Sequence, residues 1–173
     1  MNENYYSFLM IDFKMPSFIK RLQETIPESE LYFSNDPEDK AEYGLETETH
    51  VTLAPCLDND LNLLDELKKF VKPIGEYKAM LTDVSIFENE EYDVLKCSIK
   101  SAQMFETNAE IGRNFEMHTE YDYHPHMTVA YMKKGTAKKY KKYVLGELVE
   151  LEPTNFAFGY RDEDGRYQRI TWR

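Results

Sequence analysis

The sequence predicts an α+β fold: two pseudo-symmetric lobes of antiparallel sheet, with helices on their outer sides, that form a central cleft. The main observation is that the stretch His50–Ala54 returns 76 residues later as His126–Ala130, with a His, a Thr and an Ala at matching positions. Predicted strands and helices also alternate along the chain without linkers or low-complexity tracts. Because 173 residues is an ordinary domain length, we expect residues 1–173 to form a single bilobal domain.

The first half of the chain is expected to build one lobe around the first repeat. In order, we expect a strand over 5–13, a helix opened by Pro16 and ended by Pro27, a short strand over 31–33, a polar loop over 34–48, the first repeat strand over 50–54 and a helix over 61–71. Proline fits the first turn of a helix because its missing N–H has no partner there. Proline also removes a ladder donor from a strand, so we expect Pro55 to close the first repeat strand.

The second half is expected to open with a hairpin and to end with closing strands. In order, we expect strands over 77–87 and 92–98, a helix over 102–115, a loop over 116–123, the second repeat strand from 124, a helix over 136–145 capped by Gly146, and strands over 148–151, 155–160 and 167–172. The pair Asp164-Gly165 is typical of a tight turn and is expected to connect the last two strands.

Each repeat places a histidine and a threonine on one face of a strand, because side chains two positions apart point the same way. His50 is therefore beside Thr52, and His126 is beside Thr128. A neutral imidazole takes or gives a proton near neutral pH, so two of them can divide the acid–base work on one phosphodiester. The two hydroxyls can donate hydrogen bonds to the non-bridging phosphate oxygens. This chemistry needs no metal and no cofactor, and it suits RNA-type phosphodiesters that have a 2′-OH or a cyclic phosphate.

Two other interpretations of these residues stay open. One histidine on a strand is commonly structural and one threonine is commonly a strand former, so a structural protein with accidental repeats is an alternative. A metal site from His50, His118, His124 and His126 is another, although no carboxylate or thiol stands at a recognised ligand spacing. The conjunction favours catalysis, because the same spacing and the same apolar flanks occur half a chain apart.

Charge and composition narrow the class of partner. The formal net charge of −11 disfavours a protein that coats long nucleic acids, because such binding neutralises many phosphates. The dense basic stretch over 133–142 is expected to be mostly a solvated surface, with Lys133 or Lys134 as a candidate for attracting a phosphate. No run of about 18 apolar residues is present, so no membrane span is expected. Two cysteines and the absence of a signal-peptide pattern predict a cytoplasmic location.

The segments His50–Leu53 and His126–Val129 resemble the twin signatures of the 2H phosphoesterase superfamily. That resemblance implies two α+β lobes with a cleft that holds one His-x-Thr from each. It also implies that His50 and His126 are the acid and the base, and that Thr52 and Thr128 bind phosphate.

Within this superfamily, the small size, the acidic balance and the form Pro125–Tyr131 are most similar to phage anti-CBASS phosphodiesterases. The similarity implies cyclic di- and trinucleotide substrates with 3′,5′ linkages, and a host bacterial cytoplasm if the protein is phage-encoded. An RNA 2′,3′-cyclic phosphodiesterase is the alternative inside the superfamily. A protein that sequesters cyclic nucleotides without turnover is the alternative outside it, but a pure binder has no need for both histidines and both threonines.

A nucleotide substrate also requires surfaces on which its bases stack, and aromatic side chains supply them. The candidates are Tyr6 in the first strand, Tyr131 after the second repeat and Trp172 near the last residue. Trp172 is ranked first because it is the only tryptophan. Glu163 in the last turn is a candidate acceptor for a base amine. The alternative for each aromatic is packing in the core, and the alternative for Glu163 is an ordinary turn residue.

Overall fold

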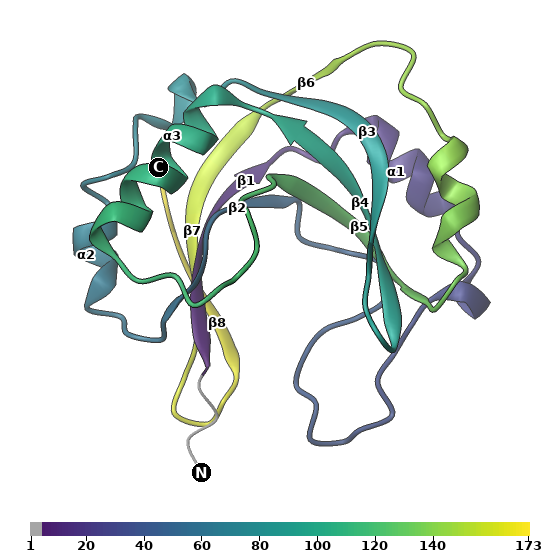
Figure 1. Ribbon diagram of the computed structural model, residues 1–173, viewed down its shortest axis with the longest axis horizontal. Helices are drawn as coiled ribbons and strands as arrows, with labels where there is room; N and C mark the ends of the chain where they lie inside the picture. Colours follow the sequence, from purple (N-terminus) through teal and green to yellow (C-terminus); the bar gives the residue numbers. More distant parts are fainter. Residues whose placement is uncertain (1–4) are drawn as a thin grey trace.

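Two four-stranded antiparallel sheets make up the fold. The computed structural model describes residues 5–173 (Figure 1). The first sheet has the order β2 (His50–Asp58), β1 (Tyr6–Phe13), β7 (Pro153–Arg161), β8 (Tyr167–Trp172). The second sheet has the order β5 (His126–Lys133), β4 (Tyr92–Lys100), β3 (Ala79–Glu88), β6 (Val149–Leu151). The predicted α+β class with two antiparallel sheets is confirmed.

The two repeats occupy equivalent places in the two sheets. β2 is the edge strand of the first sheet, β5 is the edge strand of the second, and the two strands contact each other. Figure 1 shows the sheets joined as an arch, with β1, β2 and β7 on one side and β3, β4 and β5 on the other. The repeat strands therefore meet where the two lobes join.

The described residues form three α-helices and three 3-10 helices: α1 (Ser17–Glu24), η1 (Glu28–Glu30), α2 (Leu63–Leu67), η2 (Ile74–Glu76), α3 (Ala102–Asn114) and η3 (Ala137–Lys142). α1 follows a strand of the first sheet but packs against β5, and α3 follows a strand of the second sheet but packs against β2. Each repeat strand is thus supported by a helix from the other lobe. In Figure 1, α2 and α3 lie at one end of the arch and α1 lies at the other.

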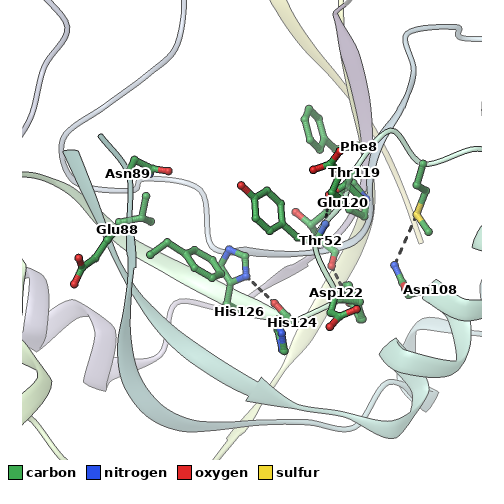
Figure 2. A pocket seen from close by; sticks show the side chains of 16 residues that line it. Phe8, Thr52, Glu88, Asn89, Asn108, Thr119, Glu120, Asp122, His124 and His126 are labelled. Carbon is green, nitrogen blue, oxygen red and sulfur yellow. Dashed lines mark hydrogen bonds between the residues drawn. The ribbon is translucent and has the colours of Figure 1, made fainter. Parts of the chain in front are cut away.

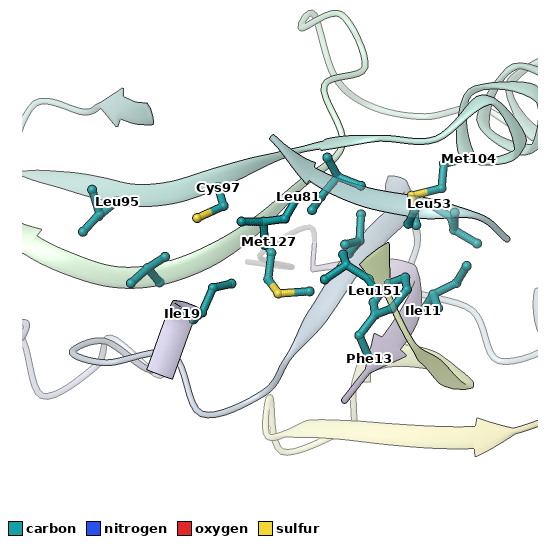
Figure 3. Close-up of a cluster of buried hydrophobic side chains, with 14 of the residues drawn as sticks. Ile11, Phe13, Ile19, Leu53, Leu81, Leu95, Cys97, Met104, Met127 and Leu151 are labelled. Atoms are coloured by element: carbon teal, nitrogen blue, oxygen red, sulfur yellow. The ribbon is translucent and has the colours of Figure 1, made fainter. Parts of the chain in front are cut away.

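One hydrophobic cluster contains residues from both sheets. On β1, Leu9, Ile11 and Phe13 are buried in this cluster, whereas Phe8 and Asp12 alternate onto the opposite face. Figure 3 shows side chains from both sheets within the cluster, among them Ile11, Leu53, Leu81, Leu95 and Met127. Burying a large aliphatic side chain stabilises a fold by roughly 1.5–3 kcal/mol, so this shared core holds the two repeat strands in place.

The prediction that Pro55 closes the first repeat strand is wrong. β2 continues to Asp58 through an irregular register, where Cys56 has a φ of 52°. Proline is tolerated at this point because β2 is an edge strand, so the missing N–H removes no ladder bond. The carbonyl of Cys56 accepts a hydrogen bond from the N–H of His118 at 2.8 Å, which ties the segment before β5 to the outer edge of β2.

Two predicted helices are shorter than expected. The helix over 61–71 is reduced to α2, which is followed by a turn. The helix over 136–145 is the 3-10 helix η3, which ends at Lys142, so the prediction that Gly146 caps it is wrong. Lysines that are neighbours on an α-helical face repel one another, and η3 contains four of them. The spacing of a 3-10 helix instead places the buried Ala137 and Tyr140 on one face.

The segment between α1 and β2 also differs from its prediction. The short strand over 31–33 is wrong, since only an isolated bridge between Leu31 and Met132 forms there. The predicted hairpin β3–β4, the helix α3 and the closing strands β7 and β8 are confirmed, with no end shifted by more than two residues. No helix within residues 5–173 is long and apolar enough to span a bilayer.

Candidate active site

A pocket of about 760 Å³ lies between the two sheets. Thr52 reaches it from β2 and His126 reaches it from β5 (Figure 2). The other lining residues come from β1, from β2, from the β3–β4 hairpin, from α3 and from the loop before β5: Phe8, Pro55, Phe87, Glu88, Asn89, Val94, Asn108, Met117, Thr119, Glu120, Tyr121, Asp122, Tyr123 and His124. Pockets that hold small ligands commonly measure about 300–1,000 Å³, so this one has the volume of a ligand site.

The orientation of His126 is set by its own strand. Its Nδ1 lies 2.8 Å from the carbonyl oxygen of His124, and a carbonyl can only accept, so Nδ1 carries the proton (Figure 2). In the neutral ring, Nε2 is then the unprotonated nitrogen. Burial, with smaller contributions from the charges of Lys96 and His50, lowers the pKa of His126 to about 4, against the opposing hydrogen bond to His124. His126 is therefore a neutral base at pH 7.

The second histidine, His50, sits in a more acidic environment. Its Nδ1 lies 4.0 Å from Oε2 of Glu48 and is buried without a hydrogen bond. Burial lowers the pKa of His50, while the carboxylates of Glu48 and Asp12 favour its protonated form and Arg169 opposes it. Carboxylates next to an imidazole stabilise the imidazolium, so this site is better suited than that of His126 to hold a proton that will be donated.

Asp12, the neighbour of His50 on β1, is held by Arg169 of β8. Asp12 and His50 are cross-strand partners, so their side chains share a face of the first sheet. Arg169 donates two hydrogen bonds to the Asp12 carboxylate, at 3.0 and 2.5 Å, and Asn155 donates a third at 2.6 Å. The Nε of Arg169 lies 3.4 Å from Glu48. This network places one arginine and two carboxylates beside His50.

The two threonines are positioned by the same strands as the histidines. Thr52 lines the pocket, and the hydroxyl of Tyr123 donates to its carbonyl oxygen at 2.8 Å. Asn108 donates to the next carbonyl, that of Leu53, at 2.8 Å. Thr128 is half-buried on the same face of β5 as His126 but does not line the pocket. Because β2 contacts β5, and the charge of His50 acts on His126, the structure brings both pairs to one place.

Tyr131 belongs to a cluster of four tyrosines, which are Tyr32, Tyr43, Tyr92 and Tyr131. Burial raises the pKa of Tyr131 to about 12. Its backbone N–H donates to Gly44 and its carbonyl accepts from Tyr32, so the segment over 31–46 is tied along the edge of β5. The predicted polar loop over 34–48 is thus fixed at both ends. Tyr131 packs within this cluster and does not line the pocket.

The other predicted contact residues lie outside the pocket lining. Tyr6 is on the same face of β1 as Phe8, but its ring stacks on His118 at 5.3 Å. Lys133 is exposed, does not line the pocket, and donates to the carbonyl of Ser29 at 2.8 Å. Neither residue is brought together with the two histidine–threonine pairs.

Trp172 packs in the core and Glu163 lies in a turn, as their alternative interpretations expected. Trp172 stacks on Phe156, with ring centroids 5.4 Å apart, and packs against the core. It lies on the opposite face of β8 from Arg169, because the two are three positions apart in a strand. Glu163 is exposed in the β7–β8 turn. Ranking Trp172 first because it is the only tryptophan was misleading, since a single large aromatic is also an effective core residue.

A family model described as the 2'-5' RNA ligase superfamily matches residues 18–165. The chain belongs to this superfamily. A comparison with curated proteins finds no match. Among solved structures, the chain is similar to Usb1 of Kluyveromyces marxianus, with a TM-score of 0.54 and 10% sequence identity over 97% of each chain. At that identity the likeness concerns the fold.

Membership of the 2'-5' RNA ligase superfamily makes this protein a 2H-type phosphodiesterase, as the paired signatures predicted. The family match spans both His-x-Thr strands, and the solved structure shares the fold over nearly the whole chain. The agreement covers the enzyme class and the fold, which are the two levels at which the sequence was most informative.

Sequence reasoning missed a polar strip beside His126, which consists of Asp83, Ser85, Lys96 and Ser98. Ser98 is the cross-strand partner of His126, and Lys96 is that of Thr128. Ser85 is in turn the partner of Lys96 on β3. These residues stand at alternate positions in strands whose other face is apolar, so their alternation is a signal that they share the cleft face with the repeat. Sequence reasoning likewise missed Asp12 and Arg169.

The alternative of a four-histidine metal site is not formed. Within the part of the chain that the structure describes, no three His, Cys, Asp or Glu side chains are grouped so that they can hold a metal ion. His118 is instead paired with Asp58, with Nε2 2.8 Å from its carboxylate.

The burial of His126 predicts a pH-dependent stability. Its folded-state pKa of about 4 lies below the ordinary value of 6.5, so between these values the unfolded chain binds a proton that the folded chain does not. Stability is therefore lost as the pH falls through this window, by about 2 kcal/mol between roughly pH 7.5 and 5 for this residue alone. Urea unfolding of wild type and His126→Gln at both pH values measures this, because other groups titrate in both proteins. An equal loss in the two proteins would contradict the prediction.

Proposed function

We propose that this protein is a metal-independent phosphodiesterase that opens 3′,5′-linked cyclic di- and trinucleotides by acid–base catalysis between His50 and His126. The observation that carries the proposal is the contact between the two repeat strands, which places Thr52 of one and His126 of the other in the lining of one pocket. We propose the bacterial cytoplasm as its location and the removal of CBASS defence messengers as its role, which corresponds to a phage-encoded protein.

In the proposed reaction, the unprotonated Nε2 of His126 takes the proton of a ribose 2′-OH. The 2′ oxygen forms a bond to phosphorus as the bond from phosphorus to the 5′ oxygen breaks, and protonated His50 gives its proton to that leaving oxygen. The product end is a 2′,3′-cyclic phosphate, which water opens with the two histidines in exchanged roles. The assignment rests on the contrast between the two histidines. Burial lowers the pKa of both, but the Glu48 and Asp12 carboxylates oppose that shift at His50, whereas the Lys96 ammonium adds to it at His126.

The charge of the pocket supports a small substrate. Three carboxylates, those of Glu88, Glu120 and Asp122, are among the lining residues. A long nucleic acid brings many phosphates and needs many cations, so these carboxylates oppose it. A cyclic dinucleotide has two phosphates, and its bases have amino groups that can donate to carboxylates. Among the aromatic residues in the lining, the exposed rings of Tyr121 and Phe87 and the half-buried ring of Phe8 offer surfaces on which bases can stack.

A second candidate is favoured by the family itself. The superfamily is described by activity on RNA, so an RNA 2′,3′-cyclic phosphodiesterase is the alternative, in which the pocket receives one RNA end. This alternative uses the same two histidines and requires no contact with a long strand.

Product analysis in excess EDTA separates these functions. The substrates are a 3′,5′-linked cyclic di- and trinucleotide, the 2′-deoxy form of the cyclic dinucleotide, and a linear RNA that ends in a 2′,3′-cyclic phosphate. We expect cleavage of the ribose-containing rings, no cleavage of the 2′-deoxy ring, and loss of activity in the double variant His50→Ala/His126→Ala. Cleavage of the linear RNA end alone would establish the second candidate. Tight binding of a ring without turnover would mean a sequestering protein and would refute the enzymatic proposal.

A further inference from the structure

Lys96, in the middle of β4, is a buried lysine on the cleft face of the second sheet. Only 6% of its surface is exposed. Its Nζ donates to the hydroxyl of Ser85 at 2.7 Å and lies 4.1 Å from the centre of the Phe87 ring. An ammonium has three donors, so two N–H groups are left after the bond to Ser85.

No carboxylate of the described residues forms an ion pair with Lys96. The carboxylate of Asp83 raises the pKa of Lys96, but by less than burial lowers it. The carboxylate of Asp83 is exposed and accepts from the hydroxyls of Thr82 and Ser98 instead. Lysine is almost never fully buried unless it is paired, because removing an ammonium from water is costly.

The corresponding cation of the first sheet shows the contrast. Arg169 also lies on the cleft face, next to His50, but Asp12 and Glu48 neutralise it. Each lobe therefore has one partly or fully buried cation beside its histidine, and only the cation of the second lobe lacks a counter-charge among the described residues. Burying the Lys96 ammonium without a counter-charge costs free energy. Proteins tolerate such a cost at functional sites, and here an anionic ligand would supply the missing charge.

The neighbours of Lys96 indicate where such a ligand would bind. Lys96 is the cross-strand partner of Thr128, so the two side chains share a face about 5 Å apart at Cβ. The Phe87 ring touches both Lys96 and the His126 ring, whose centroid is 4.9 Å away. Phe87 lines the pocket and Lys96 does not, so this ring covers the ammonium. Phe87 is 38% exposed, which leaves it room to rotate toward solvent.

We propose that Lys96 forms an anion-binding site under Phe87, which receives a non-bridging oxygen of the substrate phosphate beside Thr128. The inference deepens the proposed function by adding a cation to a site whose other donors are neutral hydroxyls. Rotation of Phe87 exposes the ammonium, and the phosphate then accepts from Nζ and from the Thr128 hydroxyl. A charge-assisted bond to phosphate is stronger than a neutral one, so Lys96 supplies affinity as well as orientation.

The test measures binding of adenosine 3′-monophosphate by calorimetry, which does not depend on turnover. Lys96→Met keeps the length of the side chain without its charge, and Lys100→Met removes an exposed lysine from the same strand as a matched control. We expect Lys96→Met to weaken binding by about 10- to 100-fold, which is the typical effect of one hydrogen bond to a charged group. Lys100→Met is expected to bind within about twofold of wild type, and Lys96→Arg is expected to recover part of the affinity.

Thermal unfolding without ligand separates binding from a structural role. If Lys96 serves the ligand, Lys96→Met removes an unpaired buried charge, and Tm is expected to stay the same or rise. Wild-type affinity in Lys96→Met would overturn the inference. So would a loss of folding in both Lys96→Met and Lys96→Gln, because the ammonium would then be structural. If wild type binds the nucleotide through Lys96 but cleaves no phosphodiester, the inference stands and the proposed function fails.

Discussion

Replacing His126 with glutamine is expected to lower kcat for phosphodiester cleavage by about 10²–10⁴-fold, with little change in KM. Glutamine retains a donor for the His124 carbonyl but has no nitrogen that takes a proton at neutral pH. The unprotonated Nε2 of His126 is therefore what the variant lacks, whereas the pocket walls are unchanged. Steady-state kinetics on a cyclic dinucleotide measures the effect.

The matched control is His118→Gln, since His118 also lies near a strand edge but is paired with Asp58 and does not line the pocket. We expect its kcat to stay within about twofold of wild type, because surface substitutions away from a site have small effects. A His126→Gln enzyme with wild-type kcat would contradict the assignment of His126 as the base. A rise of KM alone would reassign it to substrate binding.

Asp12→Asn is expected to destabilise the protein by about 2–3 kcal/mol and to lower Tm by roughly 4–12 °C. The substitution keeps the shape of the side chain but removes the charge that pairs with Arg169, whose side chain is only 21% exposed. A guanidinium does not lose its proton in a protein, so Arg169 stays charged when Asp12 is replaced and is left partly buried without its main partner. Thermal and urea unfolding measure the loss.

The surface pair of Lys14 and Glu152 provides the control within the same chain. Both side chains are more than 70% exposed and their charged atoms are 4.0 Å apart. We expect Glu152→Gln to change stability by no more than about 0.5 kcal/mol, because water screens exposed ion pairs. Equal effects of Asp12→Asn and Glu152→Gln would show that the Arg169 network does not stabilise the fold.

The repeats made the fold and the enzyme class predictable because their signal is periodic and occurs twice. A His-x-Thr on a strand fixes which side chains share a face, and its recurrence in the second half implied two lobes. The alternation on β1, with Leu9, Ile11 and Phe13 buried, is visible in the sequence for the same reason. These are local patterns, and local patterns can be read without knowing which strands are neighbours.

Features that depend on the position of a strand in its sheet were not predictable in this way. Pro55 was expected to end its strand, but an edge strand tolerates it. The apolar residues of η3, Ala137 and Tyr140, are three positions apart, and this spacing fits either an α-helix or a 3-10 helix, so the sequence did not distinguish them. To predict where the Trp172 side chain lies, one must know which face of β8 packs on the core.

The candidate site was predictable in its centre and not in its surroundings. Spacing pointed to the four repeat residues, of which Thr52 and His126 line the pocket, and their catalytic roles stay a prediction. Lys96 and Arg169 lie near the two histidines because of how neighbouring strands pair. The place of Lys96 depends on an irregularity in the pairing of β4 with β5, and that of Arg169 depends on the pairing of β8 with β7. The carboxylates and aromatic rings that line the pocket come from turns and from the loop before β5, where sequence periodicity is absent.

Cleavage of a cyclic dinucleotide in excess EDTA by wild type, His50→Gln, His126→Gln and the double variant tests the central claim most directly. Two histidines that act together in one proton-transfer step predict that wild type stays active in EDTA. They also predict that the double variant is about as slow as the slower single variant, since residues that act as a unit are not additive. Activity that disappears in EDTA and returns with a divalent metal would contradict the claim, as would single-variant effects that multiply in the double variant.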